Sequence, residues 1–126
     1  MNQTLKKSAK SALENAYVPY SNFGVGAAVK MESGNIYTGC NIENASFSLT
    51  CCAERTAIFK AISEGETRFN EMAVIANTAK PVSPCGSCRQ VMAEFFSKDT
   101  VIYLLSIDGA QYKTNITEIL PFHFEL

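Results

Sequence analysis

The stretch CAERTAIFKAISEGETRFNEMAVIAN, residues 52–77, contains the pattern that decides the fold. Its apolar residues recur at helical spacing between Ala57 and Ile62, which predicts an amphipathic helix. Gly65 follows that pattern, and glycine ends helices because it readily adopts a left-handed backbone. The segment EMAVIAN, residues 71–77, is short and mostly apolar, so it predicts a buried strand directly after the helix.

The same order of helix and strand returns further along the chain. After Pro84, helical spacing is shown by Val91, Met92, Phe95 and Phe96. The run TVIYLL, residues 100–105, is rich in β-branched and apolar residues and predicts a second buried strand. Strands that alternate with helices favour parallel crossovers, which bring the helix starts to the carboxyl edge of the sheet. We therefore expect the helix starts near Cys52 and Cys85 to meet at one edge.

The remaining segments complete one α/β arrangement. Leu5, Ala9 and Ala12 have helical spacing, so residues 2–17 are predicted to form a helix that ends near Pro19. A hairpin is predicted from two strands, residues 24–31 and 35–41, that turn at Gly34. Residues 111–114 are predicted to form an edge strand, and residues 115–120 a short closing helix. The expected fold is a single three-layer domain over residues 1–126, with a mixed sheet of about five strands and helices on both faces.

Composition narrows the classes of function. The formal net charge is −1, with 11 basic and 12 acidic residues spread along the chain, so no basic face for a phosphate backbone is expected. Nucleic acid is therefore not an expected partner. No run approaches the roughly 18 apolar residues of a membrane span, and no signal peptide pattern is present at the start. We expect a cytoplasmic protein without a membrane partner.

The cysteines indicate metal or redox chemistry. Five cysteines are an odd number, and their spacing suits thiolates better than a disulfide framework. Cys52 stands beside the carboxylate of Glu54, and the segment PCGSC supplies Cys85 and Cys88. Three such ligands leave the fourth tetrahedral position of Zn²⁺ open for water. The only histidine is His123, so histidine-based metal sites and Cys–His or Ser–His nucleophiles lack parts.

A site of three thiolates needs positive charge nearby. Three thiolates exceed the charge of one Zn²⁺, which weakens its effect on a bound water unless the protein compensates. Two sources of compensation are predicted, namely the N-terminal amides of both cysteine-bearing helices and the side chain of Arg55. In a regular helix Cys52 and Glu54 would point about 200° apart. Cys52 is therefore expected in the irregular first turn, where both side chains can face one cavity.

Four segments together carry a family resemblance. CAERTA, SPCGSCRQV, FGVGAA and GCNIENA occur in the order and context of the small homotetrameric cytidine deaminases, and the chain resembles that family over essentially its whole length. The resemblance implies that Cys52, Cys85 and Cys88 bind a single Zn²⁺. It also implies that Glu54 carries protons between the attacking water and the pyrimidine, so that cytidine and deoxycytidine yield uridine and deoxyuridine with release of ammonia in pyrimidine salvage.

The resemblance extends to the substrate contacts. It implies that Asn41 and Glu43 hold the ribose hydroxyls, that Phe23 packs on the base, and that Phe124 enters the site of a neighbouring subunit. From its position, the backbone near Ala53 is expected to hold the edge of the base. The implied assembly is a homotetramer whose active sites are completed by neighbouring subunits. Two features depart from the family pattern. Phe47 stands where tyrosine is usual, and the sequence stops almost immediately after Phe124, which makes Phe122 a rival for the role of Phe124.

Other functions remain open from the residues alone. The same metal pattern occurs in deaminases of other amines, such as an aminonucleoside antibiotic or a cytosine or adenine in RNA. A thiol redox or structural zinc module, in which Glu54 is incidental, is an alternative of a different class. Asn41 and Glu43 could also serve only to cap a loop. Cys40 and Cys51 are interpreted as small buried residues rather than metal ligands.

Overall fold

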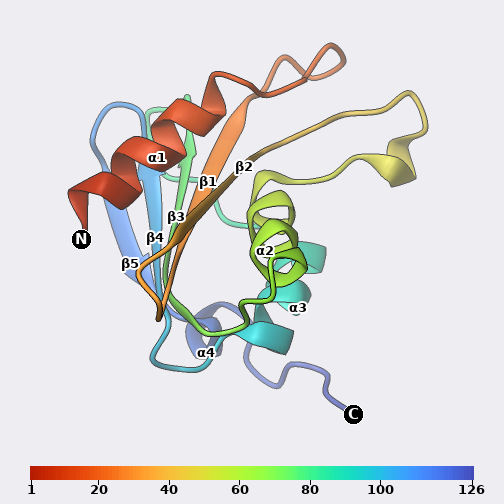
Figure 1. Ribbon diagram of the computed structural model, residues 1–126. Helices are drawn as coiled ribbons and strands as arrows, with labels where there is room; N and C mark the ends of the chain where they lie inside the picture. The colour runs from red at the N-terminus through yellow and green to blue at the C-terminus, as the bar shows by residue number, and fades with distance from the viewer.

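A computed structural model describes residues 1–126, and its centre is a mixed sheet with the strand order β2-β1-β3-β4-β5 (Figure 1). The strands are β1 Val25–Met31, β2 Ile36–Cys40, β3 Phe69–Ala76, β4 Val101–Ser106 and β5 Gln111–Thr114. Only β3 and β4 are parallel, and the other neighbours are antiparallel. The predicted hairpin turns at Gly34, whose φ of 96° is a conformation that glycine adopts without strain. The prediction of a mixed sheet of about five strands is confirmed.

Helices cover both faces of this sheet and make three layers, as predicted (Figure 1). The helices are α1 Gln3–Leu13, α2 Ala53–Ser63, α3 Gly86–Phe95 and α4 Ile116–Ile119, with a short 3₁₀ turn, η1, at Phe47–Leu49. Helix α1 packs on one face, where Leu5 and Ala9 contact residues of β1, β3 and β4. Helices α2, α3 and α4 share the larger apolar core on the opposite face. None of these helices combines the length and the apolar character that crossing a membrane requires.

Two glycines allow helices to approach the sheet closely. A Cβ placed on Gly39 would lie 2.5 Å from the nitrogen of Ala57 and 2.6 Å from the carbonyl oxygen of Ala53, both in α2. A Cβ on Gly26 would lie 2.2 Å from the carbonyl oxygen of Ala9 in α1. Contacts this short do not occur between real atoms, so only glycine permits this packing. The start of α2 is thereby held directly against β2.

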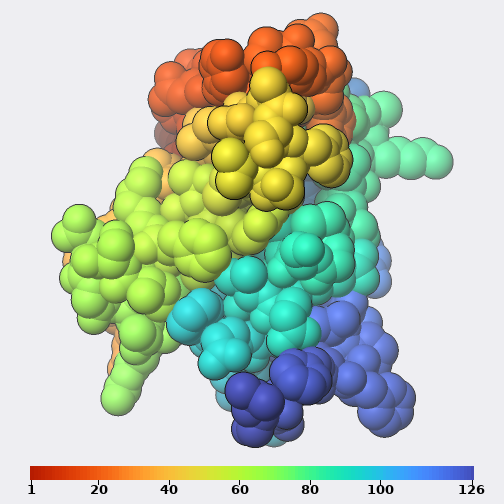
Figure 2. All heavy atoms as spheres, turned by 90° about the vertical axis from the view of Figure 1, so that its right-hand side faces the viewer, coloured from red at the N-terminus to blue at the C-terminus, as the bar shows by residue number.

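The direction of the strands brings the starts of α2 and α3 together. Strands β2 and β3 both run antiparallel to β1, so their carboxyl ends lie at the same edge of the sheet. Residues 41–52 lead from the end of β2 to α2, and residues 77–85 lead from the end of β3 to α3. Figure 2 views the helical face, with the 41–51 loop toward one end and the C-terminal tail at the other. The predicted meeting of both helix starts at one edge therefore follows from the strand order.

Several boundaries differ from the sequence predictions. Helix α1 ends at Leu13 and does not continue to residue 17, because Tyr17 forms a β-bridge with Ile42 and its N–H donates to the carbonyl of Asn41 at 3.0 Å. Strand β3 starts at Phe69, earlier than predicted, because Phe69 pairs with β1 across a bulge. The η1 turn was not predicted from the sequence.

Candidate active site

Three cysteine sulfurs gather where the two helices begin. Cys52 is the N-cap of α2 and Cys85 the N-cap of α3, both with extended backbone, and Cys88 lies in the first turn of α3. The Sγ atoms of these residues all lie within 4.8 Å of one another, and those of Cys52 and Cys85 are 3.8 Å apart. The expected irregular position of Cys52 before the first regular turn is thus observed. The group is positioned to hold one metal ion.

The donor chemistry of this group fits Zn²⁺. Thiolates are soft ligands that select zinc over magnesium or calcium, and three of them leave one tetrahedral position for another molecule. Cys85 is exposed while Cys88 is fully buried, so the group has one solvent-facing side and one protein-facing side. Cys51 lies outside the group and accepts a hydrogen bond from the Thr56 hydroxyl at 3.4 Å. Cys40 is also outside it.

Positive groups approach two of the sulfurs. The Arg55 guanidinium donates from Nη2 to Sγ of Cys52 at 3.4 Å, and the N–H of Cys88 donates to Sγ of Cys85 at 3.4 Å. No backbone amide of α2 donates to the sulfur of Cys52, so the prediction that both helices contribute amides to the sulfurs was wrong for α2. The Cys52 sulfur lies instead 3.8 Å from the sulfur of Cys85 and beside the side chain of Arg55. Arg55 provides the nearby positive charge for that sulfur instead.

These contacts change the acidity of the thiols. Hydrogen bonding to Cys88, together with Arg55, lowers the pKa of Cys52 to about 5. The hydrogen bond to Cys52 and burial raise the pKa of Cys88 above its usual value. The positive charge of Arg55 therefore favours a thiolate at Cys52, which is the form that binds metal.

Glu54 is a buried acid beside the sulfurs. It occupies the first turn of α2 and is only 5% exposed. Burial raises the pKa of its carboxyl to about 7, and the nearby charge of Cys52 acts in the same direction. A carboxyl group with a pKa near neutrality both gives and takes protons readily at physiological pH.

Glu54 faces a small hollow that is lined mainly by apolar side chains. The hollow has a volume of about 190 Å³ and is lined by Phe23, Val25, Asn41, Cys52, Ala53, Glu54, Val74, Val82, Ser83 and Cys85. Both helix starts and the end of β3 contribute to it. Sites for small molecules are usually hollows of this kind, with a mostly apolar lining and a few polar groups. Two of the three cysteines of the group, Cys52 and Cys85, open onto this hollow.

The structure brings some predicted substrate residues together and keeps others apart. Phe23, Asn41 and Ala53 line the hollow beside Glu54. Glu43 lines a neighbouring hollow that also includes Phe47. Phe124 lies elsewhere, next to α3, where its carbonyl accepts a hydrogen bond from Gln90 at 3.0 Å and the residue is 69% exposed.

Asn41 and Glu43 both bind the loop before β1. The Asn41 amide oxygen accepts from the N–H of Val25 at 2.9 Å, and its Nδ2 donates to the carbonyl of Phe23 at 2.8 Å. Glu43 Oε1 accepts from the N–H groups of Tyr20 and Ser21 at 3.0 and 3.1 Å. The loop-capping role that the sequence left open is therefore present in both residues.

Arg89 is a residue near the site that the sequence predictions missed. Its Nε donates to the carbonyl of Pro84 at 2.9 Å, and its Nη1 donates to the carbonyl of Ile119 at 2.6 Å. It thereby ties the loop before Cys85 to the end of α4. Its position directly after Cys88 was the available signal, because a side chain there begins next to the cysteine group.

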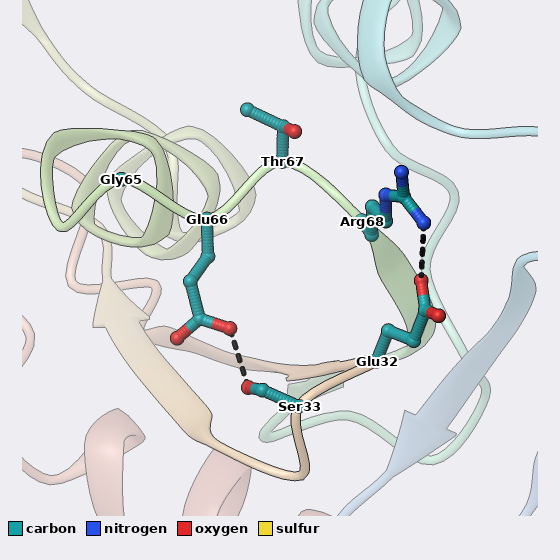
Figure 3. A pocket seen from close by; sticks show the side chains of 6 residues that line it. All are labelled: Glu32, Ser33, Gly65, Glu66, Thr67 and Arg68. Carbon is teal, nitrogen blue, oxygen red and sulfur yellow. Dashed lines mark hydrogen bonds and ion pairs between the residues drawn. The ribbon is translucent and has the colours of Figure 1, made fainter.

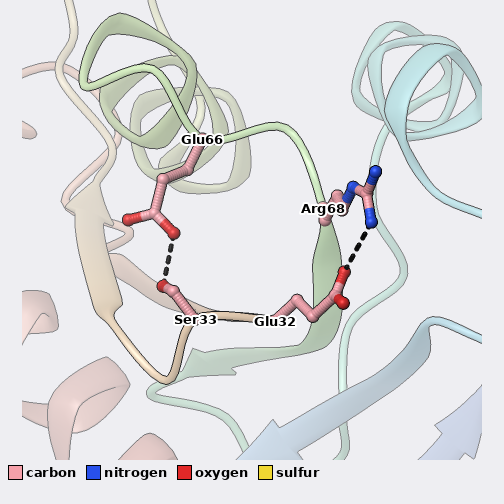
Figure 4. A network of polar contacts seen from close by, with 4 residues as sticks. All are labelled: Glu32, Ser33, Glu66 and Arg68. Carbon is pink, nitrogen blue, oxygen red and sulfur yellow. Dashed lines mark hydrogen bonds and ion pairs between the residues drawn. The ribbon is translucent and has the colours of Figure 1, made fainter.

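A larger hollow lies at the opposite edge of the sheet and lacks this chemistry. It measures about 420 Å³ and is lined by Glu32, Ser33, Gly65, Glu66, Thr67 and Arg68 (Figure 3). The lining contains no sulfur and no apolar side chain. Glu66 accepts a hydrogen bond from Ser33, and Arg68 forms a solvent-exposed ion pair with Glu32 at 3.5 Å (Figure 4). These contacts fasten the β1–β2 turn to the start of β3.

A three-layer fold, three clustered cysteine sulfurs and a buried acid together define a zinc-dependent deaminase. Residues 1–104 match the family model of the cytidine and deoxycytidylate deaminase zinc-binding region. A cytidine deaminase of Sporosarcina psychrophila is 52% identical over 97% of this chain and 90% of its own length. One of Halalkalibacterium halodurans is 53% identical over 97% of this chain and 92% of its own length.

A solved structure agrees with these relatives. The crystal structure of cytidine deaminase from Burkholderia pseudomallei superposes with a TM-score of 0.94 at 43% identity, over 98% of this chain and 99% of the other. The chain belongs to the cytidine deaminase family. The predicted family, fold class and zinc cofactor are confirmed, and a redox or structural zinc module is not favoured.

Proposed function

We propose that this protein deaminates free cytidine and deoxycytidine by hydrolysis, giving uridine or deoxyuridine and ammonia. The observation that carries the proposal is the buried carboxyl of Glu54, which shares a small and mostly apolar hollow with Cys52 and Cys85. The family membership and the cytidine deaminases among its relatives support the same substrate. A near-neutral chain with a formal net charge of −1 supports a nucleoside over a polynucleotide.

In this proposal Cys52, Cys85 and Cys88 hold the zinc ion. A bound Zn²⁺ lowers the pKa of water, which provides a nucleophile at neutral pH. Arg55 donates to the Cys52 sulfur and offsets part of the negative charge that three thiolates bring. The mostly apolar lining gives the hollow a lower effective dielectric than water, so charges inside it interact more strongly than in solution.

Glu54 is the proposed proton carrier. It takes a proton from the attacking water and gives it to N3 of the pyrimidine as the oxygen bonds to C4. It then carries the second proton to the amino nitrogen, so that the C4–N bond breaks and ammonia leaves. The pKa of about 7 that burial gives this carboxyl suits both directions of transfer.

The other residues that line the hollow are proposed to orient the nucleoside. Phe23 packs on the base, and the backbone near Ala53 holds the polar edge of the base. Asn41 and Glu43 hold the sugar hydroxyls, and each retains hydrogen-bonding capacity beyond its contacts with the loop. Phe47 then provides an apolar surface, without a hydroxyl, near Glu43.

A homotetramer is the proposed assembly, in which neighbouring subunits complete each site. The exposed apolar side chains support it, since Phe47 is 90% exposed, Leu49 66% and Phe124 69%. Phe124 or the adjacent Phe122 then reaches the hollow of a neighbouring subunit. Sedimentation of the purified protein tests this, and a monomer would contradict it. We further propose that the 126 residues act as one domain, in the cytoplasm and in pyrimidine salvage.

One comparison tests the activity and its chemistry together. Purified protein is assayed by absorbance on cytidine and on a single-stranded oligonucleotide that contains cytosine. We expect turnover of cytidine alone, and activity only on the oligonucleotide would overturn the proposal. Glu54→Ala should retain zinc yet lose about 10³-fold in turnover, because the proton carrier is gone. Glu64→Gln, at the exposed far end of α2, is the matched control that should remain active.

A further inference from the structure

The segment that presents Phe23 to the hollow is held by hydrogen bonds from residues after β2. Asn41 binds the backbone on both sides of Gly24, at the carbonyl of Phe23 and the N–H of Val25. Glu43 binds the backbone N–H groups of Tyr20 and Ser21. The position of the Phe23 ring therefore depends on contacts with the strand end that leads to Cys52.

The hydroxyl of Ser21 joins these contacts. It donates to Glu43 Oε2 and at the same time accepts from the N–H of Phe23 at 3.0 Å. Between them, Asn22 has a φ of 58°, a left-handed conformation that asparagine tolerates better than most residues. The turn thus bends back so that one hydroxyl contacts both the backbone of Phe23 and the side chain of Glu43.

We propose that Ser21 is a positioning residue for substrate binding, which holds the Phe23 ring and the Glu43 carboxylate as one unit. The inference rests on the proposed function, in which these two residues contact the nucleoside. Ser21 lies beside Glu43 in the neighbouring hollow and outside the one that contains Glu54. Its hydroxyl already donates to Glu43 and accepts from Phe23, so it acts through these two partners. Its loss should weaken binding of the nucleoside and leave the proton transfers unaffected.

The hydrogen bonds to Glu43 explain why this positioning matters. Oε1 accepts from two backbone N–H groups, which fills its two lone pairs. Oε2 accepts from the Ser21 hydroxyl, which leaves one lone pair for a substrate hydroxyl. Without the Ser21 hydroxyl, Oε2 has two free lone pairs, and water binds the one that Ser21 occupied. The carboxylate then no longer offers a single directed acceptor.

A second serine in the chain makes the same two kinds of contact as Ser21 and provides a matched control. At the opposite edge of the sheet, the Ser33 hydroxyl donates to Glu66 Oε1 (Figures 3 and 4). The same hydroxyl accepts from the N–H of Asn35 at 3.2 Å. The arrangement repeats that of Ser21, Glu43 and Phe23, with the same spacing of two residues from serine to donor. Its surroundings contain neither the cysteines nor Glu54. Ser33→Ala therefore reports what loss of such a contact costs in structure alone.

Steady-state kinetics on cytidine compare Ser21→Ala with Ser33→Ala, and thermal unfolding is recorded for both. We expect Ser21→Ala to raise KM about tenfold with kcat little changed, because a hydrogen bond to a charged acceptor is lost. Ser33→Ala should keep the KM of the parent protein, while its Tm should fall by about as much as the Tm of Ser21→Ala. Ser21→Thr retains the hydroxyl and should restore KM. Equal KM values for Ser21→Ala and the parent protein would overturn the inference.

A double variant tests whether Ser21 acts through Glu43. In the Glu43→Gln background, Ser21→Ala should change KM by less than about twofold, because the acceptor it aligns is already altered. Independent, multiplying effects would overturn the role assigned to Ser21. A parent protein that leaves cytidine unchanged would overturn both this inference and the proposed function. An active parent protein with an unaffected Ser21→Ala variant would overturn this inference alone.

Discussion

Nη2 of Arg55 lies 3.4 Å from Sγ of Cys52, and the Nε of the same guanidinium is buried without a hydrogen-bond partner. A second contact, from Nη2 to the carbonyl of Thr50, is 3.5 Å long. A buried donor that is left unpaired costs free energy, which the attraction of the guanidinium to a thiolate offsets. The position of this side chain is therefore explained by the negative charge of the cysteine group.

Replacing Arg55 by alanine should weaken zinc retention. Loss of a group that hydrogen-bonds a metal ligand commonly costs about 10- to 100-fold in metal affinity, and we expect an effect of this size. Competition with a chelator measures it. Arg68→Ala removes an arginine whose side chain is 81% exposed and should leave zinc affinity unchanged. Equal zinc affinity in Arg55→Ala and the parent protein would contradict the role in charge compensation.

The two adjacent cysteines should respond differently to substitution. Cys52→Ser should lose zinc binding because it removes one of three sulfurs, whereas Cys51→Ser should retain one zinc per chain. Zinc released by acid is measured with a colorimetric indicator. Loss of zinc from both variants to the same extent would assign Cys51 to the metal group as well.

Gly39→Ala should displace the start of α2. The added Cβ would fall 2.5 Å from a backbone nitrogen of α2, so the helix must move, at a cost of about 1–3 kcal/mol in unfolding free energy. Activity should fall as well because Glu54 moves with the helix. Gly86→Ala, where nothing lies within 4 Å of the new Cβ, is the control for unfolding in urea. Equal stability of the two variants would show that α2 adjusts freely.

Glu66 should make stability depend on pH on the acid side. Hydrogen bonds from Ser33, Tyr37 and Asn35 lower the pKa of this carboxyl below its ordinary value of 4.5. Its contribution to stability is therefore present above about pH 4.5 and is lost as the pH falls through the lower folded-state pKa. Urea unfolding of the parent protein and Glu66→Gln should converge as the pH falls. A constant difference between them would argue against this contribution.

Local patterns predicted the helices and the metal group well. Cys52, Cys85 and Cys88 stand at helix starts, and strand order alone brings those starts to one edge of the sheet. The end of α1 was not predictable in this way. Tyr17 leaves the helix because it pairs with Ile42, a residue distant in sequence, and short-range spacing contains no information about that bridge.

The surroundings of the site were only partly predictable for the same reason. Ser21 hydrogen-bonds Glu43 because two loops meet beside β1. Neither loop has a sequence pattern from which this contact could be predicted. The family resemblance identified Phe23 and Asn41, and both line the hollow. It also indicated Phe124, whose expected place is the site of a neighbouring subunit and which lies beside α3 in its own chain.

The close approach at Gly26 and Gly39 has a mechanical consequence. The two residues stand on paired strands, diagonal to one another, and face α1 and α2 on opposite sides of the sheet. The β1–β2 hairpin is therefore held between two helices, which approach it from opposite faces at nearly the same point. Helices cover both faces of the hairpin here, so the amide protons around this point should exchange slowly with solvent. Helices α1 and α2 thus keep their places against the sheet because two side chains are absent.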